Sequence, residues 1–327
     1  MTKIENIANL ESLPKPKSEH LWADYIELLA LQNLDSEMTR ADLLSRVQER
    51  KDLGEIESVG LNEESNGATV DDKLDLFIND CFMQIEYRIG AFEDVYPFML
   101  AEKGRILRRK EKLSSLNKLY VFFLLAANLR YINEKRRHDI TSMFEIASLE
   151  ALKNYLPRNA STILFGSNPR NTNERYKGKL SKKIFNLAED LHERPLIQEE
   201  DVDERNSGDA GLDIVAYLPF EDKAEGMLYI FCQCACSEDW VSKQHDCSHQ
   251  AWENKIKFTS LFPHMVFMPF CFRDATGRWF DHLKIYKSIL IDRVRLINLL
   301  KNNPESVIDI GDLPTVDEYL SERETLF

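Results

Sequence analysis

The chain has 327 residues, a formal net charge of -13, 43% hydrophobic residues and 30% charged residues. This length favours two domains, and the composition is that of a globular protein rather than a disordered or fibrous one. The acidic balance opposes unspecific attraction to nucleic acid, because phosphate binding relies on Lys and Arg. Two basic runs, Lys103 to Arg137 and Arg170 to Lys183, are candidate phosphate-binding surfaces; the alternative is solvated helix faces paired with nearby acids.

The N-terminal residues show no basic stretch followed by an apolar run, so we expect no secretory signal. The longest apolar run, Tyr120 to Ala127, falls well short of the roughly 20 residues that cross a bilayer. We therefore expect a cytoplasmic protein that does not bind membranes. In that compartment the six cysteines are expected to stay reduced.

The first half of the chain has the pattern of a helical domain. Residues 18–32 show the apolar spacing of one helix face, with Ser18 as a candidate N-cap, and Thr39 with Asp42 resembles a capping box before a second helix. The acidic segment from Glu55 to Asp72 is predicted to be a loop. Helical patterning resumes at Lys73, and residues 116–132 are apolar enough for a buried helix.

The pattern changes near residue 157, where we place the domain boundary between residues 1–157 and 158–327. The second part is predicted to be an α/β domain. We expect a helix over 179–191, a helix over 250–261 and a helix-like tail over 278–300. The predicted strands lie near 162–166, over 212–220 and 227–236, and over 264–272 with Pro269 at a strand end or edge.

The segment from Gly208 to Cys236 carries the pattern G-D-x-G-x-D, a turn, and a strand with a glutamine. It resembles the PD-(D/E)XK restriction-endonuclease-like superfamily, with Asp209, Gly211, Asp213 and Gln233 at the matching positions. The resemblance covers about residues 160 to 290. It implies a mixed sheet flanked by helices, metal-dependent hydrolysis of DNA, and a third metal ligand at the backbone carbonyl of Cys234.

Phosphodiester hydrolysis gains from Mg²⁺ or Mn²⁺, which neutralises charge on the phosphate oxygens and lowers the pKa of water. Mg²⁺ prefers oxygen ligands, and Asp213 and Gln233 offer a carboxylate and an amide oxygen on two predicted strands. Side chains alternate along a strand, so Asp213 shares a face with Val215, and Gln233 with Phe231. A register that brings Asp213 opposite Gln233 would create a metal site.

The chain departs from the family pattern at Ala235, where the superfamily has a lysine. That lysine stabilises the charge that develops on the phosphate, so either another cation replaces it or the activity is weak. Lys243, Lys255 and Lys257 follow, and we favour Lys255 or Lys257. The resemblance also calls for an acid on an upstream helix, for which Glu189 is the candidate, while Asp209 is expected to shape the glycine turn.

Each of these residues also has a structural interpretation. Asp213 could cap a turn at a strand start, Gln233 could bond a neighbour, and the lysines and Glu189 could be solvated. Cys232, Cys234 and Cys236 with His245, Cys247 and His249 suggest zinc. However, alternate strand residues lie about 7 Å apart, too far to converge on one ion, unless Cys247 and His249 cross over to Cys236.

A Cys–His nucleophile pair lacks a glycine elbow or a helix N-terminus, and the sequence has no phosphate-loop or dinucleotide-binding fingerprint. The leading hypothesis is a magnesium-dependent DNA endonuclease of restriction or antiviral defence. It would work with DNA, with a partner ATPase or sensor protein, and with further copies of the chain. The alternatives are an inactive nuclease fold that binds nucleic acid or protein, and a zinc-stabilised interaction protein.

Overall fold

The computed structural model describes residues 7–15, 18–52, 70–198 and 208–323. The chain forms two compact units, and neither is continuous in sequence. Unit 1 comprises Met1–Arg137, Phe270–His282 and Val307–Phe327, and unit 2 comprises His138–Pro269 and Leu283–Ser306. This division differs from the expected boundary at residue 157, because most of one long helix folds with unit 2 while the last helices of the chain fold with unit 1.

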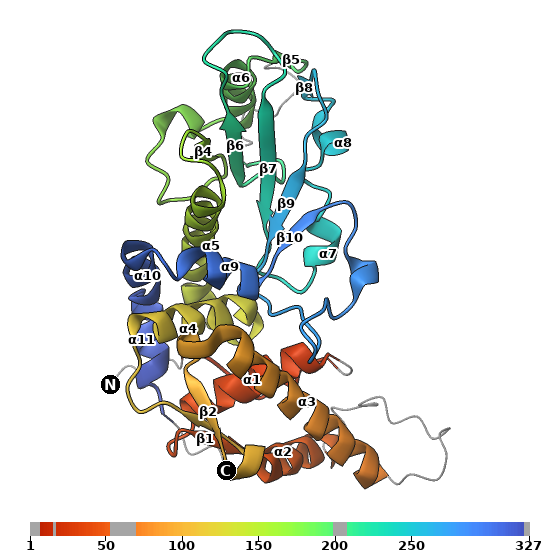
Figure 1. Cartoon of the computed structure of the whole chain (residues 1–327), viewed down its shortest axis with the longest axis vertical. Coiled ribbons are helices and arrows are strands. Elements are labelled where there is room, and N and C mark those ends of the chain that lie inside the picture. The colour runs from red at the N-terminus through yellow and green to blue at the C-terminus, as the bar shows by residue number, and fades with distance from the viewer. Residues whose placement is uncertain (1–6, 16–17, 53–69, 199–207, 324–327) are drawn as a thin grey trace. The chain divides into compact units, whose positions relative to one another are not determined.

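Unit 1 combines helices with a small sheet (Figure 1). The strands pair antiparallel in the order β1-β3-β2, which the prediction of an all-helical region did not include. Its elements are α1 (Glu19–Gln32), β1 (Glu37–Thr39), α2 (Arg40–Asp52), α3 (Val70–Phe92), β2 (Phe98–Ala101), β3 (Ile106–Arg109), α4 (Ser115–Ala127), most of α10 (Pro304–Gly311) and α11 (Pro314–Ser321).

The predicted capping box is present at the start of α2. The Asp42 N–H donates to Thr39 Oγ1 at 3.0 Å, and the Thr39 N–H donates to Asp42 Oδ2 at 3.0 Å. Ser18 stands at the N-cap of α1, but its hydroxyl makes no capping hydrogen bond. Most of the acidic segment from Glu55 to Asp72 lies outside the described residues, and its last three residues begin α3.

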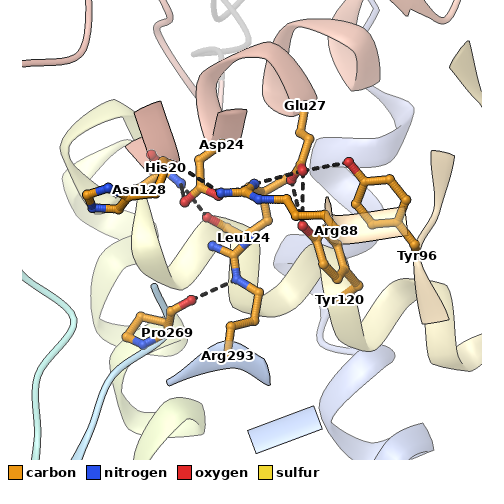
Figure 2. A network of polar contacts seen from close by, with 10 residues as sticks. All are labelled: His20, Asp24, Glu27, Arg88, Tyr96, Tyr120, Leu124, Asn128, Pro269 and Arg293. Carbon is orange, nitrogen blue, oxygen red and sulfur yellow. Dashed lines mark hydrogen bonds and ion pairs between the residues drawn. The ribbon is translucent and has the colours of Figure 1, made fainter. Parts of the chain in front are cut away.

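A charged network lies in the core of unit 1 (Figure 2). The Arg88 guanidinium, fully buried, donates to Asp24 Oδ1 at 2.6 Å and to Glu27 Oε1 at 2.7 Å. Tyr96 and Tyr120 donate their hydroxyls to the Glu27 carboxylate at 2.7 and 2.8 Å. Burying these carboxylates is tolerated because each charge has a partner and further donors.

Unit 2 is built on a five-stranded mixed sheet with the order β10-β9-β7-β6-β4 (Figure 1). β4, β6 and β7 pair antiparallel, whereas β9 runs parallel to β7 and β10 parallel to β9. These strands are β4 (Ser161–Leu164), β6 (Ile214–Leu218), β7 (Leu228–Cys234), β9 (His264–Phe267) and β10 (Ile289–Ile291); β5 (Arg194–Pro195) and β8 (Ile256–Lys257) form a separate ribbon.

Helices lie on both faces of this sheet, so the expected α/β class with a helix-flanked mixed sheet is confirmed. On one face, Val215, Phe231 and Tyr229 pack with α6 (Leu180–Asp190) in one apolar cluster that includes Trp252. On the other face, the side chains of Cys234 and Ser148 of α5 (Glu134–Tyr155) form a hydrogen bond. The remaining helices are α7 (Trp240–Lys243), α8 (His249–Trp252) and α9 (Arg293–Leu300).

Two predicted helices are wrong in extent. The segment 250–261 holds only the end of α8, because Ile256 instead pairs with Pro195 and the Lys255 carbonyl accepts from Leu196 N–H. The segment 278–300 splits into β10 and α9 at Asp292, whose side chain caps α9 through the N–H of Arg295. Pro269 follows the end of β9, as expected.

Candidate metal and phosphodiester site

The register of β6 and β7 makes Asp213 and Gln233 neighbours. Ile214 pairs with Cys232, so Asp213 and Gln233 are the next residues beyond that pair. The Asp213 N–H donates to Cys232 O at 3.0 Å, and the Asp213 carbonyl accepts from Phe165 N–H at 2.8 Å. Both side chains are buried, with 5% and 8% of their residues' surface exposed. The backbone of Asp213 is thereby held from the strands on both sides.

The two side chains meet at the backbone of Cys234. Asp213 Oδ2 accepts from the Cys234 N–H at 2.6 Å, and Gln233 Nε2 makes a long contact of 3.4 Å with the Cys234 carbonyl. Gln233 Oε1 is buried and has no hydrogen-bond partner among the described residues. A buried acceptor without a partner is costly and rare in folded proteins. A carboxylate, a vacant amide oxygen and a backbone carbonyl are oxygen ligands that fit a hard divalent cation.

The glycine turn before β6 brings another carboxylate to this place. Asp209 Oδ1 accepts from the Gly211 N–H at 2.9 Å, as expected of a residue that shapes the turn. Gly211 has φ +77°, and a Cβ there would lie 2.4 Å from Asp246 Cβ, so the turn requires glycine. A Cβ on Gly166 would lie 3.3 Å from Asp213 Oδ1 and 3.7 Å from Asp209 Oδ2. Both carboxylates therefore border the backbone of Gly166.

The electrostatics of Asp213 are those of a buried acid among acids. Burial raises its pKa well above the ordinary value, and the charges of Glu145 and Asp209 raise it further. The Cys234 N–H and the Lys243 ammonium act in the opposite direction. A carboxylate crowded by carboxylates is typical of functional sites, because a bound cation can compensate the repulsion.

Glu145 of α5 is a further candidate site residue, which the sequence prediction did not include. It is half-buried, and its Oε2 accepts from Asn168 Nδ2 at 2.8 Å. Burial raises the pKa of Glu145, the Asn168 hydrogen bond lowers it, and Asp209 raises it. A signal existed in the sequence: Glu145 stands at helical spacing from Ser148, Leu149 and Leu152, which are all buried. An acidic residue on the buried face of a predicted helix is a candidate site residue.

Three predicted site residues are placed elsewhere. The Glu189 side chain is 75% exposed and pairs with Arg175 at 2.6 Å. Lys255 Nζ donates to the Ala251 carbonyl at 2.6 Å, and Lys257 is exposed on the β5–β8 ribbon. An ion pair thus accounts for Glu189 and a carbonyl contact for Lys255, and Lys257 is an exposed strand residue. The lysine whose charge acts on Asp213 is Lys243, at the end of α7.

The cysteines do not form a metal centre in the part of the chain that the structure describes, where no three His, Cys, Asp or Glu side chains converge as metal ligands. Cys247 lies in the apolar cluster and donates to the carbonyls of Phe231 and Met265, both at 3.7 Å. Burial raises the pKa of Cys232, Cys234 and Cys236 well above the thiol value. Thiols of high pKa are poor nucleophiles, so the Cys–His alternative gains no support.

The basic runs are partly neutralised by acids. In the first run, Lys118 pairs with Asp312 and Asp317 at 3.0 and 2.9 Å, and two arginines make similar pairs. In the second run, Arg175 pairs with Glu189 and Asp190. Arg170 and Lys182, however, are exposed and make no ion pair within the described residues. The second run therefore keeps an exposed cation, Arg170, two residues from Asn168.

None of the helices in the described ranges has the length and apolar character needed to span a membrane. Searches of family models, of curated proteins and of solved structures found no match to this chain.

Proposed function

We propose that this chain is a metal-dependent endonuclease with a restriction-endonuclease-like core in unit 2, and that it hydrolyses phosphodiester bonds of DNA. The observation that carries the proposal is the buried Asp213–Gln233 pair, in which the amide oxygen has no partner among the described residues and burial and the charges of Glu145 and Asp209 raise the pKa of the carboxylate. The helix-flanked mixed sheet is compatible with this core. The choice of DNA rests on the resemblance of the G-D-x-G-x-D segment.

The chain's own residues have distinct roles in this proposal. Asp213, the Oε1 of Gln233 and the carbonyl of Cys234 hold the cation, and Glu145 takes the role of the upstream helix acid. When bound, Mg²⁺ or Mn²⁺ supplies charge neutralisation and makes water more acidic. The Cys234 N–H donates to Asp213 Oδ2 at 2.6 Å, which fixes that oxygen and opposes the rise of the Asp213 pKa that burial causes.

Lys243 is the residue to which we assign the role of the lysine that is absent at Ala235. Ala235 is fully buried, and its N–H donates to Phe267 O at 2.9 Å, so this position belongs to the sheet interior. Lys243 is half-buried on α7, and its charge lowers the pKa of Asp213. We assign it the stabilisation of negative charge on the phosphate during attack, a role in which one removed donor typically costs about 10²–10³ in rate.

The test is plasmid cleavage with Mg²⁺ or Mn²⁺. Wild type is compared with Asp213→Ala and with Glu189→Ala, an exposed acid of the same unit that serves as the matched control. We expect cutting by wild type and by the control, and none by Asp213→Ala. Equal cutting by Asp213→Ala would refute the site, because the proposal gives this carboxylate no substitute.

A second candidate function is an inactive nuclease fold that binds nucleic acid or protein. It is favoured by the alanine at position 235 and by the net charge of -13. If neither metal supports cutting by wild type, while the chain still retains DNA in a gel-shift assay, this second function replaces the first. The biological setting that we propose, a cytoplasmic restriction or antiviral defence system with a partner ATPase or sensor, follows from the resemblance alone.

A further inference from the structure

The loop that follows β4, residues 166–171, contains two buried asparagines. Asn168 and Asn171 expose only 6% and 5% of their surface. A buried amide must have its donors and acceptors satisfied, so the partners of each asparagine show what it does. The two residues have the same chemistry and the same loop but different partners.

Asn171 anchors the loop to the sheet. Its Nδ2 donates to the Leu164 carbonyl at the end of β4 at 2.9 Å, and its Oδ1 accepts from the Asn173 N–H at 2.9 Å. Both partners are backbone groups close in sequence. These bonds define the path of the chain after β4 without help from any side chain of the acidic site.

Asn168 instead joins the loop to α5. Its Nδ2 donates to the Ser142 carbonyl at 2.8 Å and to Glu145 Oε2 at 2.8 Å, while its Oδ1 accepts from the Arg170 N–H at 2.8 Å. The amide cannot rotate without losing bonds on both sides, so it is a rigid donor for the carboxylate. Glu145 Oε1 makes no hydrogen bond within the described residues, which leaves that oxygen for another ligand.

We propose that Asn168 is a positioning residue that holds the Glu145 carboxylate toward Asp213, so that Glu145 serves as a side-chain ligand of the cation. This inference rests on the proposed function and extends it to a residue outside the G-D-x-G-x-D segment. The loop that carries Asn168 borders the proposed site, because a Cβ on Gly166 would lie 3.3 Å from Asp213 Oδ1 and 3.7 Å from Asp209 Oδ2. The charge of Glu145 is also among the causes that raise the pKa of Asp213. Groups that orient metal ligands typically contribute 10–100-fold (about 1–3 kcal/mol) to metal affinity.

The experiment measures Mn²⁺ binding to the full chain by calorimetry, for wild type, Asn168→Ala and Asn171→Ala. Both variants remove a buried amide of the same loop, so we expect similar losses of thermal stability. We expect about tenfold or greater weakening of Mn²⁺ binding in Asn168→Ala. Asn171→Ala should bind within about twofold of wild type, since its partners are backbone groups.

A double-mutant cycle separates positioning from a purely structural role. If Asn168 acts through Glu145, Asn168→Ala has no further effect on Mn²⁺ affinity in a Glu145→Gln background. Additive losses in that background, or equal affinities of Asn168→Ala and Asn171→Ala, would overturn the inference and leave the Asp213–Gln233 site intact. Absence of Mn²⁺ binding by wild type would remove the proposed function and this inference together.

Discussion

Asp213→Asn should stabilise the protein when no divalent cation is present. The substitution keeps the size of the side chain and an oxygen that accepts from the Cys234 N–H, but it removes the negative charge. Charged Asp213 is buried and lies near the charges of Glu145 and Asp209, which raise its pKa. At neutral pH the acid at position 213 therefore lowers the free energy of unfolding, and the amide of Asp213→Asn does not.

The magnitude follows from two opposing effects. Removal of the buried, only partly compensated charge of Asp213 raises the free energy of unfolding by about 1–3 kcal/mol. Exchange of a charge-assisted hydrogen bond from Cys234 for a neutral one loses about 1 kcal/mol. The expected net gain in free energy of unfolding is about 1 kcal/mol, which raises the melting temperature by about 2–4 °C in a domain of 150–250 residues.

The sign of the pH dependence is fixed by the direction of the shift. A carboxyl group whose folded pKa is raised stabilises the fold fully below its unfolded pKa of about 3.9. That contribution is lost as the pH rises through the folded pKa. The free energy of unfolding of Asp213→Asn should therefore exceed that of wild type by little near pH 4 and by more at pH 8.

The assay is thermal unfolding in EDTA and in Mn²⁺, with Glu189→Gln as a control for an exposed, ion-paired acid. In EDTA at pH 8, Asp213→Asn should be more stable than wild type, and the control should change little. In Mn²⁺ the order should reverse, because a cation at 100 times its Kd adds about 2.7 kcal/mol to the chain that binds it. A lower stability of Asp213→Asn in EDTA at pH 8 would refute the reasoning.

Three further predictions concern other residues. Gly166→Ala should weaken Mn²⁺ binding by about tenfold in calorimetry, because the new methyl would lie 3.3 Å from Asp213 Oδ1; unchanged affinity would show that this space is not used. Lys243→Met should slow plasmid cleavage and move the acidic limb of its pH profile upward, since Lys243 lowers the pKa of Asp213, whereas Lys257→Met should cut like wild type. Arg88→Met should lower the free energy of unfolding in urea by about 3–5 kcal/mol, because two buried carboxylates lose their counter-charge; a loss under 1 kcal/mol would contradict this.

Local patterns in the sequence predicted local structure well. The capping box at Thr39, the strands around Asp213 and Gln233 and the helix over 179–191 are present because short-range hydrogen bonds and residue alternation determine them. The same alternation predicts that Gln233 shares a face with Phe231 within β7, whereas Asp213 lies one residue before β6 begins. The observed register then makes Asp213 and Gln233 neighbours, which the sequence could state only as a condition.

Long-range partners could not be read from the sequence. Between Glu145 and Asp213 the chain forms β4, α6 and β5, and only the packing of α5 on the sheet makes the charge of Glu145 act on Asp213. Glu189 was the nearer helical acid in sequence, but it lies on the exposed side of α6 and pairs with Arg175. Spacing along the chain could not decide which lysine approaches the site, because α7 and the β5–β8 ribbon are positioned by tertiary contacts.

The Asp213–Gln233 pair has fewer hydrogen-bond donors than another buried acid of unit 2, as the proposed cation site requires. Glu193 is equally buried, with 6% exposed, yet its carboxylate accepts from the Thr259 N–H at 3.1 Å, from the Thr259 hydroxyl at 3.0 Å and from Tyr229 at 3.3 Å. The same unit can thus surround a buried acid with donors where only stability is required. At Gln233 and Asp213 it leaves an acceptor without a partner and gathers like charges, which is unfavourable unless a cation completes the site.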